Sequence, residues 1–213
     1  MLGHEAITTL LHQAVATRLR PFMEYMIREG GIPAGELRIP AVDNIYPSVV
    51  DAVALNAFPA AMIEELETGP RSSTRQISSD GFFDEYEIRY QFRVWLYVTG
   101  ANYTATSLAQ KRTATALRGA LLMHRGLYGK NGESAVIDPA TFRESFSDIT
   151  GNDGGSKYIA GSYAEFEVLV IEKLPITLDP NTLPGKLNLW VGLLDRGSEE
   201  GDPPTQVIGE EAP

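Results

Sequence analysis

Few residues in this sequence could catalyse a reaction or bind a metal, and their spacing does not match the patterns that catalysis requires. The three histidines are His4, His12 and His124. His4 and His12 are eight residues apart in a helix-like stretch, so they share a face but are too distant to hold one metal ion. No GxSxG pattern marks a serine nucleophile, and the chain has no cysteine. We therefore expect no catalytic residues, no metal and no cofactor, and we predict that the protein is not an enzyme.

A run of acidic residues precedes the most regular part of the chain. It consists of Asp80, Asp84, Glu85 and Glu87. Such carboxylates bind Mg²⁺ or hydrolyse glycosides only where they converge on a cleft. We favour a hydrated entry to a strand, but the run leaves open a rival of another class: a small metal- or carbohydrate-dependent hydrolase or binding domain.

A glycine cluster resembles a phosphate-binding loop only superficially. Gly151, Gly154 and Gly155 are followed by Lys157. A phosphate loop needs a strand before it and a helix after it, whereas here a strand pattern follows. The composition of this stretch therefore predicts a turn.

The overall charge argues against a protein that binds DNA through its phosphate backbone. Lys and Arg number 18 against 28 Asp and Glu, so the formal net charge is -10 and the sequence pI is about 4.8. No apolar run approaches the roughly 18 residues of a membrane span, so we expect no membrane association. The absence of cysteine is compatible with folding in a reducing cytoplasm.

Apolar periodicity predicts two helices and the strand between them. Spacings of three and four predict a helix over His4–Glu29, kinked or divided into two helices at Pro21. Strict alternation over Tyr86–Val98 predicts a long antiparallel strand. A second helix is predicted over Thr106–His124, capped by Thr104 or Thr106 and ended by Gly126 and Gly129.

The remaining elements are less regular. We expect an extended segment over Ala57–Glu67, a flexible hairpin loop over Gly69–Gly81 and a second long strand over Tyr158–Glu172. A weaker strand is expected over Thr141–Ile149, with Phe142, Phe146 and Ile149 packing inward. Leu187–Leu194 is a possible edge strand.

These elements predict an α+β protein whose mainly antiparallel, twisted sheet packs against helices. The changes in composition divide the chain into an N-terminal helical segment (1–30), a core domain (31–175) and a C-terminal arm (176–213) rich in Gly, Pro and Glu.

Basic and aromatic side chains on the first hairpin are candidates for contacts with a partner protein. They are Arg71, Arg75, Arg89, Arg93, Trp95 and Tyr97. Arginine and aromatic residues are enriched in interfaces, and arginine can pair with acidic groups of a neighbour. For Trp95 and Tyr97 an alternative stays open, in which another segment of the chain such as the N-terminal helix covers them.

The order of these parts resembles the tail terminator, or tail-completion, proteins of long-tailed bacteriophages. In that family a proline-containing strand with glutamates leads to a long alternating strand, then a helix, then a late strand with Tyr, Phe and Val. The matching stretches here are Phe58–Glu67 (FPAAMIEELE), Tyr86–Val98, Leu108–Leu122 and Tyr163–Val170. The long N-terminal helix, the long loop 69–81 and the segment after Pro175 depart from the family pattern.

The resemblance implies a structural virion protein of the tail or neck region, assembled in the host cytoplasm. Its copies would form a ring, usually hexameric, that caps the tail tube on one face and meets the head connector or stopper protein on the other. DNA would pass through without sequence-specific binding, along a lumen for which Asp84, Glu85, Glu165 and Glu167 are the acidic candidates. Another head–tail joining protein, such as a stopper or neck protein, and a tail-tube subunit remain alternatives.

Overall fold

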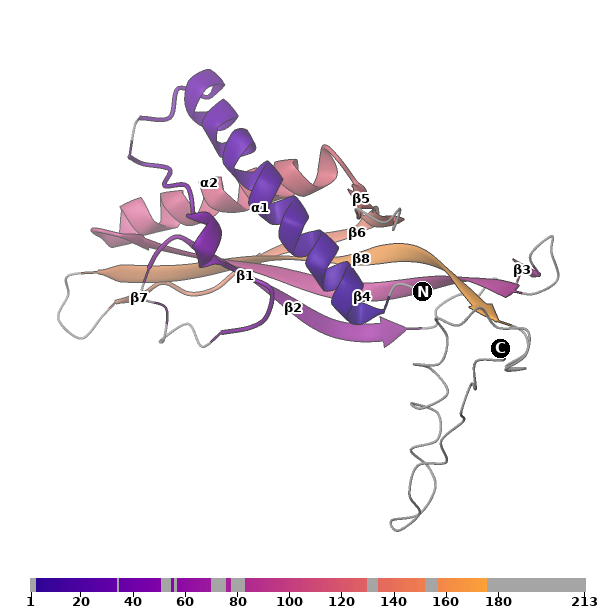
Figure 1. Cartoon of the computed structure of the whole chain (residues 1–213). Helices are drawn as coiled ribbons and strands as arrows, with labels where there is room; N and C mark the ends of the chain where they lie inside the picture. Colours follow the sequence, from indigo (N-terminus) through magenta and orange to yellow (C-terminus); the bar gives the residue numbers. More distant parts are fainter. Residues whose placement is uncertain are drawn as a thin grey trace, which may run out of the picture. The chain divides into compact units, whose positions relative to one another are not determined.

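The computed structural model describes residues 3–33, 35–50, 55, 57–69, 76–77, 83–129, 134–151 and 157–175. Within them, two helices cover one face of a mixed sheet, which confirms the predicted α+β class (Figure 1). Most of the expected loop 69–81, most of the glycine-rich turn, the apolar segment 187–194 and the arm 176–213 lie outside the described residues.

In the described part of the chain the sheet has eight strands. They are β1 (Ile45–Tyr46), β2 (Ala60–Gly69), β3 (Gln76–Ile77), β4 (Phe83–Gly100), β5 (Gly126–Tyr128), β6 (Ser134–Phe146), β7 (Thr150–Gly151) and β8 (Tyr158–Pro175). Their order is β1-β2-β4-β8-β6-β5, with β3 beside β4 and β7 beside β8. β1 runs parallel to β2, while β4 pairs antiparallel with β2 and β8 pairs antiparallel with β6. The two long strands predicted from alternation, β4 and β8, are therefore central neighbours.

Helix α1 (His4–Glu29) has the predicted bounds and is one continuous helix through Pro21, so the expected division into two helices is wrong. Pro21 lies on the exposed side, where water can satisfy the carbonyl group that a proline leaves unpaired. The opposite side of α1 is apolar and packs on the sheet. Its buried residues are Ile7, Leu10, Leu11, Ala14, Val15, Leu19 and Met23.

Helix α2 spans Tyr103–Leu122 and begins three residues earlier than expected. Its cap is Asn102, whose side chain accepts a 2.8 Å hydrogen bond from the Ala105 amide, so the predicted caps Thr104 and Thr106 are wrong. The two helices approach closely at Gly119, where a Cβ atom would collide with the Phe22 ring.

Strand β6 begins seven residues earlier than the predicted strand Thr141–Ile149 and is preceded by β5, where the sequence suggested only a helix stop. Its pairing with β8 is irregular between Asp138 and Arg143, which breaks the alternation on which sequence reasoning depends. Phe142 stacks on Phe166 at 5.6 Å between ring centroids, as expected for an inward residue. Phe146 is 49% exposed, so its predicted packing role is wrong.

Both helices share one core with the sheet. The chain divides into a compact unit, Met1–Leu174, and a separate unit, Pro175–Pro213. Helix α1 thus belongs to the same compact unit as the strands. Burial of large side chains such as Phe92, Phe166 and Leu117 between helices and sheet supplies the main driving force for this arrangement.

Candidate interaction surface

We call the face of the sheet that the helices do not cover the open face. It carries polar and aromatic side chains. It draws residues from four neighbouring strands, because alternate residues of each strand point away from the helices. From β2, β4, β8 and β6 these are Glu64, Arg89, Gln91, Arg93, Trp95, Tyr97, Asp138, Tyr163, Glu165 and Glu167.

Arg93 lies at the centre of the open face and joins three strands. Its Nη2 lies 2.8 Å from Oε2 of Glu165 on β8, and its Nη1 lies 3.1 Å from Oε2 of Glu64 on β2. Trp95 Nε1 donates to the same Glu64 oxygen at 2.8 Å, and Gln91 donates to Glu165 Oε1 at 2.8 Å. These cross-strand bonds hold the side chains in one arrangement.

Arg89 forms a second cluster nearer the start of β4. Its Nη1 lies 3.2 Å from Oε2 of Glu167 and 3.6 Å from Oδ2 of Asp138, and its Nη2 lies 3.5 Å from Oε1 of Glu87. The hydrogen bond that Arg89 donates to Glu167 raises the pKa of Arg89. Burial alone would lower the pKa of Arg93, but its hydrogen bond and the charges of its two glutamates outweigh burial and raise it. Both guanidinium groups therefore stay charged.

Aromatic rings extend the Arg93 cluster along β4 and β8. The guanidinium carbon of Arg93 lies 4.5 Å from the centroid of the Tyr163 ring and 5.6 Å from that of Trp95, within the range of cation–π attraction. Trp95 also contacts Tyr163 at 4.6 Å and stacks with Tyr97 at 5.8 Å between ring centroids. Arginine held between aromatic rings is a composition typical of interface centres.

Trp95 and Tyr97 are half-buried, and the segment that covers them is not the N-terminal helix. They pack in a small cluster with the buried residues Leu55, Ala60 and Met62, and with the partly buried Tyr46, Val50 and Phe58. Helix α1 lies on the opposite face of the sheet. The sequence correctly left open that another segment covers these rings, but it named the wrong one.

One end of the open face is apolar and exposed. Val136 on β6 is paired with Leu169 on β8, and Ile171 follows on the same side of β8. Val136 is 45% exposed and Ile171 is 67% exposed. The alternation of β8 marks Ile171 as a residue of this face, but Val136 was missed because the beginning of β6 was missed.

The structure brings together residues for which the sequence suggested separate roles. Arg89 and Arg93, expected to meet a partner, pair instead with Glu167 and Glu165, which were candidates for an acidic lumen. The lumen candidates on β8 are therefore neutralised within the chain. Arg71 and Arg75 lie outside the described residues. Asp84 and Glu85 belong to β4, but their side chains are outside the described part.

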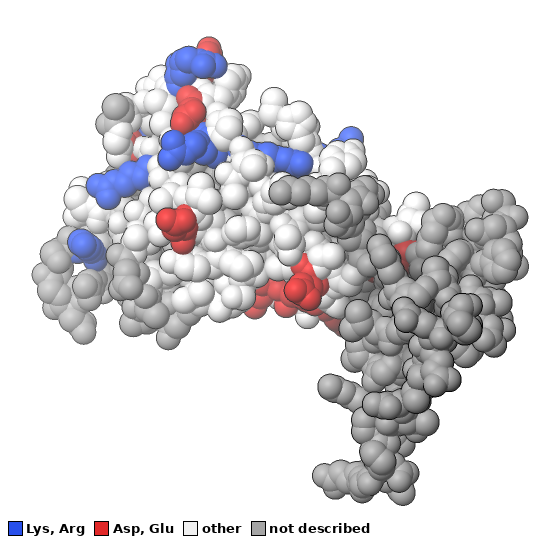
Figure 2. Space-filling view, viewed as in Figure 1, with Lys and Arg blue, Asp and Glu red and all other residues white. Residues whose placement is uncertain are grey.

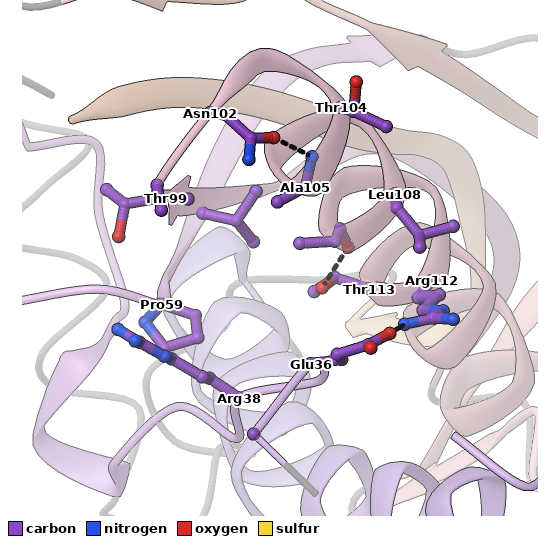
Figure 3. A pocket seen from close by; sticks show the side chains of 15 residues that line it. Glu36, Arg38, Pro59, Thr99, Asn102, Thr104, Ala105, Leu108, Arg112 and Thr113 are labelled. Carbon is purple, nitrogen blue, oxygen red and sulfur yellow. Dashed lines mark hydrogen bonds and ion pairs between the residues drawn. The ribbon is translucent and has the colours of Figure 1, made fainter. Parts of the chain in front are cut away.

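A cavity of about 450 Å³ lies on the helix side of the molecule, between the loop after α1, the end of β4 and the first half of α2 (Figure 3). Ala105, Leu108 and Pro59 provide apolar lining. Glu36 and Arg112, which form an ion pair 2.6 Å long, and Arg38 are the charged residues that line it within the described part of the chain.

Neither a metal-binding cluster nor a membrane-spanning helix occurs among the described residues. They contain no group of three or more His, Asp or Glu side chains placed to hold a metal ion. Neither α1 nor α2 is long and apolar enough to cross a bilayer.

Comparison with known proteins yields little. No protein-family model matches the sequence, and no curated protein matches it. Among solved structures, the chain is similar to one described as "Virion of native gene transfer agent (GTA) particle". The identity is 11%, the TM-score is 0.26, and the alignment covers 63% of this chain and 89% of that chain. A TM-score of this size does not establish a common fold.

Proposed function

We propose that the protein is a structural subunit of a phage-like virion and acts as a tail terminator, a ring that caps the tail tube and joins it to the head. The open face of the sheet carries this proposal. It places arginine, tryptophan and tyrosine in a fixed cross-strand arrangement over four strands rather than around a reaction centre. Such a surface recognises another protein at low entropic cost, because its side chains are already ordered.

The order of elements supports the terminator role within that class. The strand with FPAAMIEELE, the long alternating strand, the following helix and the late strand with Tyr, Phe and Val correspond to β2, β4, α2 and β8. In the structure these four elements adjoin one another: β2, β4 and β8 are consecutive in the sheet, and α2 packs on β4. The segments that resemble the family therefore form one continuous part of the fold.

The proposed mechanism is termination by shape. One surface of the ring matches the last ring of the tube, while the opposite surface lacks the self-complementarity that lets the tube grow, so further addition stops. The same opposite surface receives the head connector or stopper protein. DNA then passes through the ring without sequence-specific contacts, as the net charge of -10 per copy favours.

Imaging of particles made without this protein tests the proposal. We expect deletion of its gene, in the genome that encodes it, to give tail tubes of irregular length that are not attached to filled heads. A copy supplied in trans should restore joined particles of uniform tail length. A deletion that leaves joined particles with tails of normal length would contradict the proposal, and absence of tubes would identify a tube subunit instead.

A further inference from the structure

Helix α2 is basic in an acidic protein. Its twenty residues contain Lys111, Arg112 and Arg118 but no Asp or Glu, although the chain carries a net charge of -10. The side of α2 that faces away from the sheet carries these three residues. Together with Thr104, Leu108 and Thr115, which share their helical spacing, they form what we call the α2 outer face.

Exposed apolar side chains accompany the positive charge. Leu108 is 42% exposed within the α2 outer face. Tyr103 and Met123, at the two ends of the helix, are 62% and 68% exposed. The 450 Å³ cavity opens beside Leu108, with Arg38 on its far wall. Positive charge together with exposed apolar side chains is suited to binding an acidic surface of another protein.

The outer edge of β2 has the opposite charge. Glu64, Glu65 and Glu67 fall within this strand, which has no basic residue. Strand β1 pairs only with Ala61 and Met62, so beyond Met62 the described residues place no strand on the outer side of β2. Glu65 and Glu67 are exposed. In Figure 2 the Lys and Arg side chains lie over the helices, together with a few acidic ones, and an acidic patch lies below them.

The β2 edge is poorly suited to pairing with another strand. Its pairing with β4 shifts between Glu65 and Glu67, which marks a bulge at Leu66, and its negative charges repel a similar edge. A helix surface, by contrast, needs no backbone register. Helix α1 packs on β2 whereas α2 packs on β4 and β6, so the basic and acidic surfaces belong to different parts of one molecule.

We propose that the α2 outer face of one copy docks against the outer edge of β2 of a second copy. The two surfaces differ, so the contact is head-to-tail and repeats from copy to copy, which is the type of contact that closes into a ring. This inference rests on the proposed function, in which copies associate, and adds the residues that join them.

Two residues allow the contact to be tested without disturbing the fold. Arg112 and Arg118 pair with Glu36 and Glu144 within the chain, and Glu64 pairs with Arg93. Lys111 and Glu67 are exposed, and neither forms an ion pair with another described residue. Reversing their charges therefore changes the surfaces and leaves the internal pairs in place.

The experiment is a charge swap read by sedimentation equilibrium at low ionic strength. We expect Lys111→Glu and Glu67→Lys each to weaken self-association about tenfold, a change of about 1.4 kcal/mol. The double variant, in which the charges are exchanged, should return to within about threefold of the wild type. Lys157→Glu, a charge reversal at an exposed residue just before β8 that belongs to neither surface, should have no effect. Added salt should weaken association of the wild type.

Each outcome decides a different point. A double variant as weak as the two single variants, beside an associating wild type, overturns the assigned contact and leaves the virion role standing. A wild type that stays monomeric at its highest soluble concentration overturns the contact altogether, while particle imaging still decides the virion role independently. If Lys111→Glu abolishes binding of a DNA duplex and leaves self-association unchanged, the α2 outer face serves nucleic acid and the contact is overturned.

Discussion

Successive residues of β8 show how differently the two faces of the sheet are built. Ala164, Phe166 and Val168 point toward the helices and are at most 2% exposed. Glu165 and Glu167, between them, point to the open face and bind arginines of β4. The covered face is held by burial of apolar surface, whereas the open face is held by polar pairs that water weakens. Stability and the recognition that we propose for the open face thus depend on different residues of the same strand.

The largest effect is expected from shortening a side chain on the covered face. Phe166→Ala removes a ring that is 1% exposed and stacked on Phe142, and should lower the free energy of unfolding by about 3–5 kcal/mol. Ile171→Ala on the open face of the same strand starts from a side chain that is 67% exposed and should cost less than about 0.5 kcal/mol. Urea titrations of both variants measure the difference. Equal losses would show that the open face is covered in solution.

An intermediate effect is expected at a polar pair inside the covered face whose two side chains are nearly fully buried. Tyr90 donates a 2.6 Å hydrogen bond to Glu172 Oε1, and the two residues are 4% and 3% exposed. Tyr90→Phe leaves the carboxylate without this donor and should cost about 1–3 kcal/mol. Thermal unfolding at neutral pH measures the loss. Tyr128→Phe, at a tyrosine that is 71% exposed, is the matched control and should change little.

The same pair gives stability a dependence on alkaline pH. Burial, followed by the hydrogen bond and charge of Glu172, raises the pKa of Tyr90 above its ordinary value. The native state therefore retains the phenolic proton at a pH where the unfolded chain has lost it. The stabilisation is complete below about pH 10, where the unfolded tyrosine titrates, and decreases as the pH rises further. This decrease should be smaller in Tyr90→Phe, and an unchanged slope would contradict the assignment.

The regular elements were predictable because a single periodicity governs each of them. The bounds of α1 and the presence of β4, α2 and β8 followed from apolar spacing, since one side of each element faces the core. The beginning of β6 was missed because Pro139 and the irregular pairing after Asp138 interrupt its alternation. The cap of α2 was misassigned because the Asn102 side chain suits a turn as well as a helix cap, and residue type alone does not separate the two roles.

The candidate surface was only partly predictable for a different reason. Arg89, Arg93 and Trp95 stood out as polar or aromatic residues on one side of β4, and Glu165 and Glu167 as acids on one side of β8. Their pairing depends on which strands are neighbours and in which register, and alternation within a strand does not contain that information. The sequence therefore identified several members of the open face but assigned them to separate surfaces.

The smallest effect is expected from the open face itself, where Arg93 and Glu165 form a cross-strand pair with side chains 23% and 21% exposed. A double-mutant cycle with Arg93→Met and Glu165→Gln should give a coupling of about 0.5–1 kcal/mol, reduced by salt, because water screens the pair. Arg93→Met alone is expected to cost somewhat more, since it also leaves Glu64 beside Glu165 without the intervening cation. A coupling energy well above that of Tyr90 with Glu172, measured by the same kind of cycle, would mean that polar pairs of the open face stabilise the fold more than the buried pair of the covered face. The open face would then be a second core, and its side chains would be retained for folding rather than for contact with other proteins.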